Sequence, residues 1–269
     1  MLFGLHSKRA PRRGALFVFS CLMSATLPVM ALDCPAPGDG EQVSVVHVYD
    51  GDTVRLANGR RLRLIGINAP ESGHSDQQTQ PLAAEAEALL VSLLDRHNHT
   101  LTLRYGTKQH DNYGRLLAHA FLPDGNNPAV QLLEQGLATA LAVPPNTRAA
   151  DCYSSIESNA RGSGRGIWSL PDYRAVNAAD LTPDVRGFHL LRGRVRDIRQ
   201  SRYSIWLQLD GSLVAHISRK DLVYFPADYP EALLGQQIEL RGWLKPDRKG
   251  LKVNIRHPTA LARLEPKSD

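Results

Sequence analysis

The alternation of apolar and polar residues predicts short strands in the first half of the chain. Alternating segments flank Asn58-Gly59, the dipeptide preferred in two-residue hairpin turns, so we expect an antiparallel pair within residues 53–67. Residues 43–49 precede this pair and read as another strand. Two more strands are expected within residues 101–106 and 115–125.

Three segments between and after these strands carry helical signals. Residues 81–94 form an amphipathic pattern that begins with Pro81, a residue favoured in the first helical turn. Residues 128–136 predict a short helix closed by a glycine, and residues 147–161 predict a third. Strands and helices together favour one mixed module over residues 43–169.

The pattern changes in the second half. Residues 170–187 are rich in proline and polar residues and are interpreted as a linker. Five short strands separated by turn signals follow within residues 188–264, with one helical insert near residues 219–225. This arrangement favours a small barrel of the OB type, followed by a tail at residues 265–269.

The first 31 residues read as a secretory signal peptide. An apolar stretch ends in Val29-Met30-Ala31, a small-residue cleavage pattern, and a lead-in over residues 32–42 follows it. The alternative is an uncleaved membrane anchor. We expect export to the periplasm or the medium, with no membrane association after cleavage. The basic residues that precede the apolar stretch are Lys8, Arg9, Arg12 and Arg13.

Charge divides the chain into two unlike parts. The first 31 residues contribute +4 of the formal net charge of +5, which leaves +1 for the remainder. Within that remainder, residues 32–185 carry −6 and residues 186–269 carry +7. Such asymmetry indicates two modules, of which the basic one is suited to a polyanionic partner.

Two of the three cysteines lie outside the signal segment. Because exported proteins favour disulfides, we expect Cys34 and Cys152 to be paired. Such a bridge would tie the start of the exported chain to the third predicted helix. The alternative is two buried free thiols.

Four short motifs occur in a characteristic order in the first module. They are "YDGDTV" (49–54), "RLIGINAPE" (63–71), "DNYGR" (111–115) and "GIWS" (166–169). With them, residues 43–169 resemble the staphylococcal-nuclease-like (thermonuclease) domain. The resemblance implies a five-stranded OB-type barrel with three helices that hydrolyses DNA and RNA, usually with calcium. The expected fold class is therefore α+β, mainly β, with two five-stranded OB-type barrels.

Cleavage of a phosphodiester requires a cation, an activated water and fixed positive donors, because negative charge accumulates on phosphorus. The resemblance assigns Glu71 as the base, or as the group that orients the water. It assigns Arg63 and Arg115 to the phosphate, which guanidinium groups bind through paired hydrogen bonds. The alternative for Glu71 is a solvated loop residue.

The resemblance also implies a calcium site formed by Asp52, Asn68 and the carbonyl of Ala69. Alone, the "DGD" sequence would be typical of a plain turn. The pattern departs from that of the calcium-binding nuclease, which has an aspartate and a threonine where this chain has Asn68 and Ala69. Because fewer carboxylates weaken calcium binding, another divalent ion is an alternative.

Three further residues are candidates for substrate contact. Tyr113 matches a tyrosine near the bound nucleotide in the resembled family, although packing alone is an alternative. Asp111 could shape the same pocket. Lys108 lies in the preceding loop and could meet the backbone of the nucleic-acid strand. The alternative is an exposed lysine with no role in binding.

The second module more loosely resembles OB-fold modules that bind single-stranded nucleic acid. Arg192, Arg194 and Arg196 alternate and are expected on one face, with Trp206 on a neighbouring strand. A basic groove with aromatic platforms suits single-strand binding. The alternative is a barrel core with a solvated basic face.

Together these observations predict an exported, calcium-dependent nuclease that acts on DNA, RNA or both, with a C-terminal module for single strands. The main rival is a non-catalytic nucleic-acid-binding protein whose metal site is lost at Asn68. A weaker rival is an interaction domain for proteins, although no protein partner is inferred. The intact set of Glu71, Arg63 and Arg115 favours the enzyme.

Overall fold

The computed structural model describes residues 1, 4, 34, 38–73, 78–247 and 250–264 of the 269-residue chain. The predicted signal peptide and the predicted tail at residues 265–269 lie almost entirely outside these residues. Leu32–Asp269 form one compact unit. Within the described ranges, no helix has the length and apolarity needed to span a bilayer.

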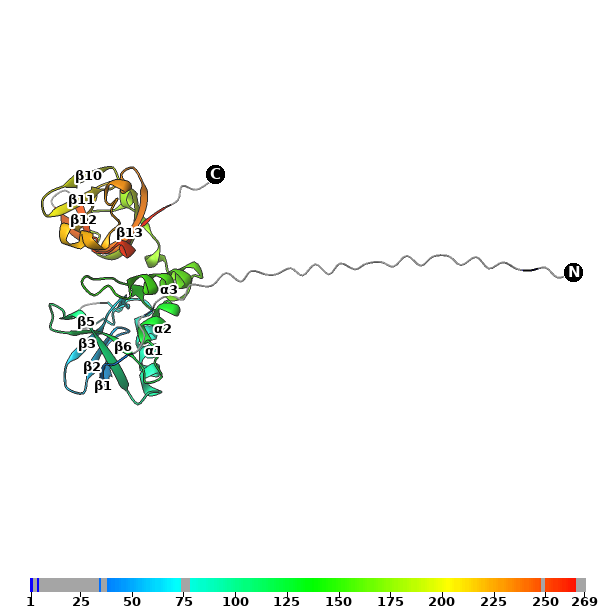
Figure 1. The fold of residues 1–269 in the computed structure, drawn as a ribbon. Helices are drawn as coiled ribbons and strands as arrows, with labels where there is room; N and C mark the ends of the chain where they lie inside the picture. Colours follow the sequence, from blue (N-terminus) through cyan, green and yellow to red (C-terminus); the bar gives the residue numbers. More distant parts are fainter. Residues whose placement is uncertain (2–3, 5–33, 35–37, 74–77, 248–249, 265–269) are drawn as a thin grey trace. The chain divides into compact units, whose positions relative to one another are not determined.

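Five strands of the first half close into a barrel (Figure 1). Their hydrogen-bonded order is β1-β2-β3-β6-β5, and β1 pairs with β5 to complete the circle. The β3–β6 pair is parallel and the other pairs are antiparallel. The strands are β1 (Glu41–Val48), β2 (Thr53–Leu56), β3 (Arg61–Leu64), β5 (Thr100–His110) and β6 (Leu116–Phe121).

The predicted hairpin is confirmed between β2 and β3, but the expected two-residue turn is wrong. The register centres the loop on Asn58, so Ala57, Asn58 and Gly59 form a three-residue loop. Its turn contains Gly59 at φ 83°, a left-handed conformation that glycine adopts without steric cost. The pairing sets Thr53 opposite Arg63 and Val54 opposite Leu62. Since alternate side chains of a strand face opposite sides, Val54 and Leu62 enter the core while Arg63 points to the other face.

The three predicted helices are present, with boundaries shifted by at most three residues. They are α1 (Ala83–Asp95), α2 (Pro128–Glu134) and α3 (Ala150–Gly162). Helix α2 begins at a proline and is capped by Asn127, whose side chain accepts a hydrogen bond from the backbone N–H of Ala129 at 2.9 Å. A short pair, β4 (Ile67–Asn68) with β7 (Thr139–Ala140), lies outside the barrel.

The second half forms a sheet with more strands than the five predicted. Its eight strands follow the order β10-β11-β12-β14-β13-β9-β8, and β15 pairs with β13. We call it the C-terminal sheet. The strands are β8 (Val176–Asn177), β9 (Gly187–Arg194), β10 (Asp197–Gln200), β11 (Ser204–Gln208), β12 (Leu213–Ser218), β13 (Gln237–Asp247), β14 (Gly250–Asn254) and β15 (Leu261–Arg263).

The additional strands are short and lie at turns or within the predicted linker. Strand β8 falls inside residues 170–187 and pairs with β9, and the adjacent Ala178 is buried in the core of the C-terminal sheet. The helical insert expected near residues 219–225 is a 3-10 helix over Arg219–Tyr224. The sheet is compatible with an OB-like module, and the fold class, mainly β with helices, is confirmed.

Ion pairs connect α3 to β13 of the C-terminal sheet. Arg241 donates to both carboxylate oxygens of Glu157, at 2.6 and 2.5 Å, and the Glu157 side chain is only 3% exposed. Glu239 accepts from Arg161 and from Arg192 at 2.5 and 2.9 Å. Because both carboxylates are largely removed from water, these guanidinium groups compensate charges that would otherwise be costly to bury.

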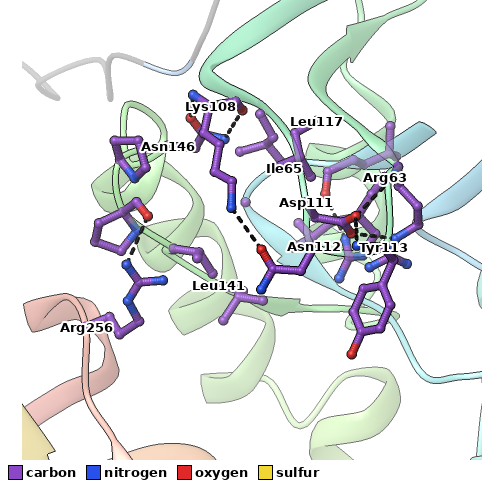
Figure 2. Close-up of a pocket in the computed structure, with 17 residues that line it drawn as sticks. Arg63, Ile65, Lys108, Asp111, Asn112, Tyr113, Leu117, Leu141, Asn146 and Arg256 are labelled. Carbon is purple, nitrogen blue, oxygen red and sulfur yellow. Dashed lines mark hydrogen bonds and ion pairs between the residues drawn. The ribbon is translucent and has the colours of Figure 1, made fainter. Parts of the chain in front are cut away.

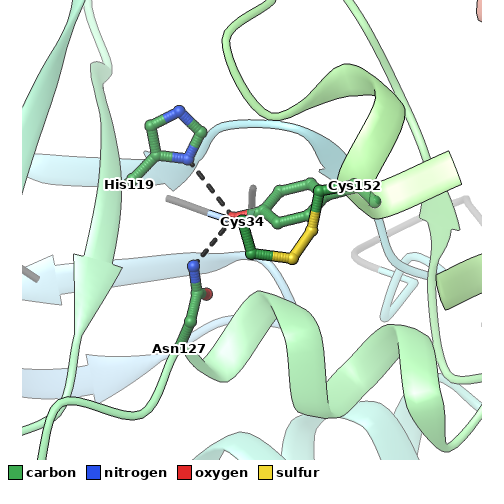
Figure 3. Close-up of a disulfide and its surroundings, with 5 residues drawn as sticks. Cys34, His119, Asn127 and Cys152 are labelled. Carbon is green, nitrogen blue, oxygen red and sulfur yellow. Dashed lines mark hydrogen bonds between the residues drawn. A yellow bond between two sulfur atoms is a disulfide. The ribbon is translucent and has the colours of Figure 1, made fainter. Parts of the chain in front are cut away.

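The predicted disulfide between Cys34 and Cys152 is present (Figure 3). It joins the lead-in to α3 across 118 residues of sequence. Beside it, the buried Tyr153 hydroxyl accepts a hydrogen bond from the Asn127 amide at 2.8 Å and lies 3.3 Å from Nδ1 of His119. Tyr153, the residue after Cys152, thus links α3 by polar contacts to His119 of β6 and to Asn127 before α2.

Candidate active site

The turn between β1 and β2 buries Asp52. Its carboxylate is 1% exposed and accepts hydrogen bonds from the backbone N–H of Ala69 at 2.7 Å and from the Thr53 hydroxyl at 3.0 Å. Gly51 allows this close packing, since a Cβ there would lie 2.8 Å from the Cβ atoms of Ala69 and Ala86. The turn is thus pressed against α1, with the Asp52 carboxylate facing β4.

Asp52 and its neighbour Asp50 are both shifted toward the protonated form. Burial raises the pKa of Asp52 to about 6, although the ion pair with Arg63 opposes that shift. Burial also raises the pKa of Asp50, and the charge of Glu71 adds to this increase. These three carboxylates, Asp50, Asp52 and Glu71, are called the acidic corner below. Their combined charge exceeds that of Arg63, so the corner favours a cation.

Arg63 connects the acidic corner to the residues of β4. Its Nε lies 3.0 Å from Asp52 Oδ1, its Nη1 donates to the Leu64 carbonyl at 2.8 Å, and its Nη2 lies 3.4 Å from the amide oxygen of Asn68. The Asn68 carbonyl accepts from the Thr139 hydroxyl at 3.3 Å. The structure therefore groups Asp52, Asn68 and Ala69, the three predicted metal ligands, beside one arginine.

Glu71 lies at the exposed end of the same segment. Its backbone N–H donates to Oε1 of Gln80 at 3.0 Å, and its carbonyl accepts from the Gln80 backbone N–H at 3.0 Å. This reciprocal pair fixes the backbone that carries the carboxylate. The side chain itself is exposed, which fits both the predicted water-activating role and the alternative of a solvated loop residue.

A cavity of about 300 Å³, here called the arginine pocket, opens beside Arg63 (Figure 2). Both candidate phosphate-binding arginines line it, as do three of the residues predicted to contact substrate. Asp52, Asn68 and Glu71 are not among its lining residues, so Arg63 forms the boundary between the pocket and the acidic corner. The predicted site residues that line the pocket are Arg63, Arg115, Lys108, Asp111 and Tyr113.

Asp111 holds the "DNYGR" turn together. Its Oδ1 accepts from the backbone N–H groups of Tyr113 and Arg115 at 2.8 and 2.9 Å, and its Oδ2 accepts from Arg115 Nε at 2.7 Å. Partial burial would raise the pKa of Asp111, but these hydrogen bonds outweigh it and lower the pKa. Asp111 thus orients Arg115, while the Tyr113 ring is 86% exposed and lies 5.6 Å from the Arg115 guanidinium.

Lys108 and Asn146 form the opposite wall. The Asn146 side chain accepts from the Lys108 backbone N–H at 2.9 Å and donates to the Lys108 carbonyl at 2.8 Å. The Lys108 ammonium lies 3.3 Å from the Asn112 amide oxygen. Sequence reasoning missed Asn146, because an isolated asparagine carries no local signal of a contact made across 38 residues. It also missed Asn112, although this residue lies within the DNYGR motif and only four residues from Lys108.

The predicted basic residues of the C-terminal sheet are exposed but already paired. Arg192 contacts Glu239, as described above. Arg196 lies 2.5 Å from Asp210, and the Arg194 guanidinium donates to the Gly235 carbonyl at 2.9 Å. Trp206 lies on β11, half-buried, with its ring 6.0 Å from that of His216. The backbone N–H of Arg196 donates to the Gln208 carbonyl of β11 at 2.8 Å, so the end of the arginine-bearing segment lies beside the strand that carries Trp206.

Comparisons with known proteins agree with this geometry. The family described as staphylococcal nuclease homologue matches residues 61–170. A thermonuclease of Staphylococcus intermedius is 32% identical over 132 residues, which cover 48% of this chain and 77% of that protein. The chain belongs to the staphylococcal nuclease homologue family. The matched family region includes Arg63, Glu71 and Arg115, and it ends before the C-terminal sheet begins.

Other members of the staphylococcal nuclease homologue family cover a similar part of the chain. Endonuclease YncB of Bacillus subtilis is 30% identical over 135 residues, 49% of this chain and 63% of that protein. An uncharacterized endonuclease of Escherichia coli O157:H7 is 31% identical over 131 residues, 48% of this chain and 77% of that protein. This chain thus spans less than two thirds of YncB. Family membership supports nuclease activity on nucleic acids.

Proposed function

We propose that this protein is an exported, metal-assisted nuclease that hydrolyses phosphodiester bonds in DNA, RNA or both. The observation that carries the proposal is the position of Arg63, which pairs with Asp52 of the acidic corner and also lines the arginine pocket with Arg115. A phosphate between the two arginines would lie beside a cation-attracting group of carboxylates. Hydrolysis of a phosphodiester needs this combination.

The donor set fits calcium. Within the described ranges, no three His, Cys, Asp or Glu side chains are grouped so that they alone could hold a metal ion. Asp52 would therefore bind the ion together with the amide oxygen of Asn68 and the carbonyl of Ala69, hard oxygen ligands of the type calcium accepts in flexible geometry. When bound, the ion would supply positive charge to the developing phosphorane.

The chain's own residues would perform the remaining steps. Arg63 and Arg115 would hold the non-bridging phosphate oxygens, and Asp111 would keep the Arg115 fork in position. Glu71 would orient the attacking water and accept its proton as the new oxygen–phosphorus bond forms and the opposite one breaks. Its exposure agrees with that task, because the water must reach it from solvent.

The C-terminal sheet would bind single-stranded substrate. Residues 186–269, which contain most of this sheet, carry a net charge of +7, whereas residues 32–185 carry −6. Tyr203 and Trp243 are 70% and 42% exposed, and exposed aromatic rings among arginines provide stacking surfaces for bases. Linked binding would raise the substrate concentration near an acidic catalytic module.

Export is supported by the disulfide. A bond between Cys34 and Cys152 persists in oxidising compartments and is rare in reducing ones. The basic and apolar pattern of residues 1–31 is consistent with this location. The proposed site of action is therefore the periplasm or the medium.

The decisive experiment measures hydrolysis of single-stranded DNA by the chain from Leu32 onward, with calcium, with other divalent ions and with chelator. Glu71→Gln should reduce the rate at least about 100-fold, because loss of a general base costs this much or more. Glu134→Gln, which alters an exposed glutamate on α2, is the matched control and should match the parent. Full activity in Glu71→Gln would remove Glu71 from the mechanism.

Asn68→Asp tests the metal assignment in the same assay. An added carboxylate should lower the calcium concentration that supports half-maximal activity. If no divalent ion supports cleavage by the parent while Asn68→Asp restores it, the natural chain is a binding protein rather than a nuclease.

A further inference from the structure

The arginine pocket receives one residue from outside the nuclease barrel. Among the described residues that line the cavity, those between positions 63 and 146 belong to the nuclease half, and Arg256 alone comes from the C-terminal half. Arg256 lies two residues after the end of β14 at Asn254. The matched family region ends at residue 170 and does not include it.

Two polar contacts hold the Arg256 guanidinium at the pocket. Nε lies 3.2 Å from Oδ2 of Asp221, and Nη2 donates to the carbonyl of Pro144 at 3.1 Å. The Asp221 side chain is 5% exposed, so its charge needs this positive partner. Asp221 belongs to the C-terminal half, like Arg256, and holds the arginine in place from that side. The Pro144 carbonyl, which belongs to the loop that forms the pocket wall, holds the guanidinium from the nuclease half.

The guanidinium stays accessible despite these contacts. The Arg256 side chain is 38% exposed, whereas that of Arg63 is 11% exposed. Figure 2 shows Arg256 on one side of the pocket and Arg63, Asp111 and Tyr113 on the other. A planar fork with donors left over, fixed at the edge of a cavity, is suited to a second phosphate rather than to the one held by Arg63.

We propose that Arg256 binds a backbone phosphate of the substrate next to the scissile one, so that the C-terminal half completes the substrate site of the nuclease half. The inference rests on the proposed function, because it assumes that a nucleic-acid strand crosses the arginine pocket. It predicts that substrates with several phosphates depend on Arg256 and that substrates with a single phosphodiester do not. Arg256 would thus select polymers over short fragments.

The experiment compares a single-stranded decanucleotide with a substrate that has one phosphodiester. In Arg256→Gln, the KM for the decanucleotide should rise about tenfold, the size of one charge-assisted hydrogen bond to phosphate. Its kcat, and both parameters for the one-phosphodiester substrate, should change less than about twofold, since the reacting phosphate keeps Arg63 and Arg115. The slope of log affinity against log salt should fall in magnitude by about 1.

Two further variants separate binding from folding. Asp221→Asn combined with Arg256→Gln removes the buried charge together with its partner, and it should show the same rise in KM if Arg256→Gln itself is unstable. Arg96→Gln, at the end of α1, removes an equal charge from an exposed arginine of the nuclease half that lies outside the pocket, and it should leave KM for the decanucleotide unchanged. An unchanged decanucleotide KM in a folded Arg256→Gln variant would refute the inference, as would equal losses on both substrates.

Failure of the proposed function would be distinguishable. If Glu71→Gln retained full activity, the catalytic assignment would fall, and affinity for the decanucleotide in chelator would still report on Arg256. A tenfold weaker Kd for Arg256→Gln in chelator would support the phosphate contact whatever the mechanism of cleavage. An equal Kd would overturn it.

Discussion

Asp111 shows how a single residue can organise the turn that carries Arg115 and Tyr113. Its carboxylate receives three hydrogen bonds from its own turn, and one of them comes from the Arg115 guanidinium. The carboxylate is therefore engaged in holding Arg115, and a direct contact with an anionic substrate would be repulsive. Arg115 and Tyr113 are the members of this turn that can meet the nucleic acid.

His119 is a second residue whose environment has a measurable consequence. It is 7% exposed, lies beside Tyr153, and faces the positive charges of Arg104 and Arg148. Burial first, and then those two arginines, lower its pKa from 6.5 to about 4. The folded protein therefore keeps this imidazole neutral at a pH where the unfolded chain protonates it.

We predict that His119 makes folding weaker in mild acid. A lowered folded-state pKa gives stability that is complete above pH 6.5 and is lost as the pH falls toward 4, with about 2 kcal/mol lost by pH 5. In His119→Asn, the decrease in the free energy of unfolding between pH 8 and pH 5 should be smaller by about that amount. Urea denaturation at the two pH values measures it.

His110→Asn is the control for this prediction, because it removes an exposed histidine from the adjacent strand β5. An equal decrease in the parent and in His119→Asn would show that the imidazole is not kept neutral by the fold. The other titrating groups are common to both proteins. Their contributions cancel in the comparison when protein concentration and salt are held constant.

Residues of the candidate site differ in how far the sequence could reveal them. Asp52, Arg63 and Arg115 lie in short motifs that resemble those of a known family, and this resemblance, rather than the residue types alone, predicted them as site residues. Asn146 and Arg256 contribute through contacts to segments 38 and 112 residues away. No local pattern encodes such contacts, because they depend on how the loops and sheets pack.

The same contrast holds for whole elements. The β2–β3 hairpin was predictable because Asn58-Gly59 marks a turn between two alternating segments, although the loop has three residues instead of the two expected. Strand β8 has two residues, too few to show any periodicity, and it forms only because β9 offers an unpaired edge. The predicted linker therefore contributes a strand and a buried alanine to the sheet.

Helix α3 depends on the disulfide for its connection to the lead-in. The bridge closes a loop of 118 residues, so its removal should lower the free energy of unfolding by about 4–5 kcal/mol in the chain-entropy description. We predict this loss for the double variant Cys34→Ala/Cys152→Ala, in which no buried hydroxyl is introduced. Urea unfolding followed by tryptophan fluorescence measures it.

Reduction of the parent protein is the internal control for the disulfide. The reduced parent should unfold at the same urea concentration as the double alanine variant, and the oxidised parent at a higher one. A difference below about 1 kcal/mol between oxidised and reduced parent would show that the bridge contributes little. Reductant should have no effect on the alanine variant.

At the scale of the whole molecule, part of the basic charge in the C-terminal half is used internally. Arg241 neutralises Glu157 of the nuclease half, so one of the positive charges counted in the net +7 is not available to nucleic acid, whereas Glu239, the partner of Arg192, is already counted in that sum. Glu157 also accepts from the backbone N–H of Ala140 at 2.8 Å, and Ala140 pairs with Ile67 beside Asn68. The ion pair therefore supports the strand pair that carries a proposed metal ligand.

This arrangement changes how the binding role of the C-terminal sheet should be tested. Deleting residues 186–269 removes Arg241 and leaves the Glu157 carboxylate without its guanidinium partner, so lower activity could come from instability rather than from lost substrate binding. A single substitution isolates the effect. Arg241→Gln should lower the free energy of unfolding by about 3–5 kcal/mol, the usual cost of leaving one charge of a buried pair uncompensated.

Neutralising both partners should restore much of that loss. In Glu157→Gln/Arg241→Gln, no charge is buried and the glutamine can still accept from Ala140, so the double variant should be more stable than Arg241→Gln. A double-mutant cycle in urea measures the coupling, and additivity within about 0.5 kcal/mol would refute the pairing. If coupling is found, truncation placed in the Glu157→Gln background should show a raised KM on long substrates and a weaker salt dependence, both of which then report on substrate binding alone.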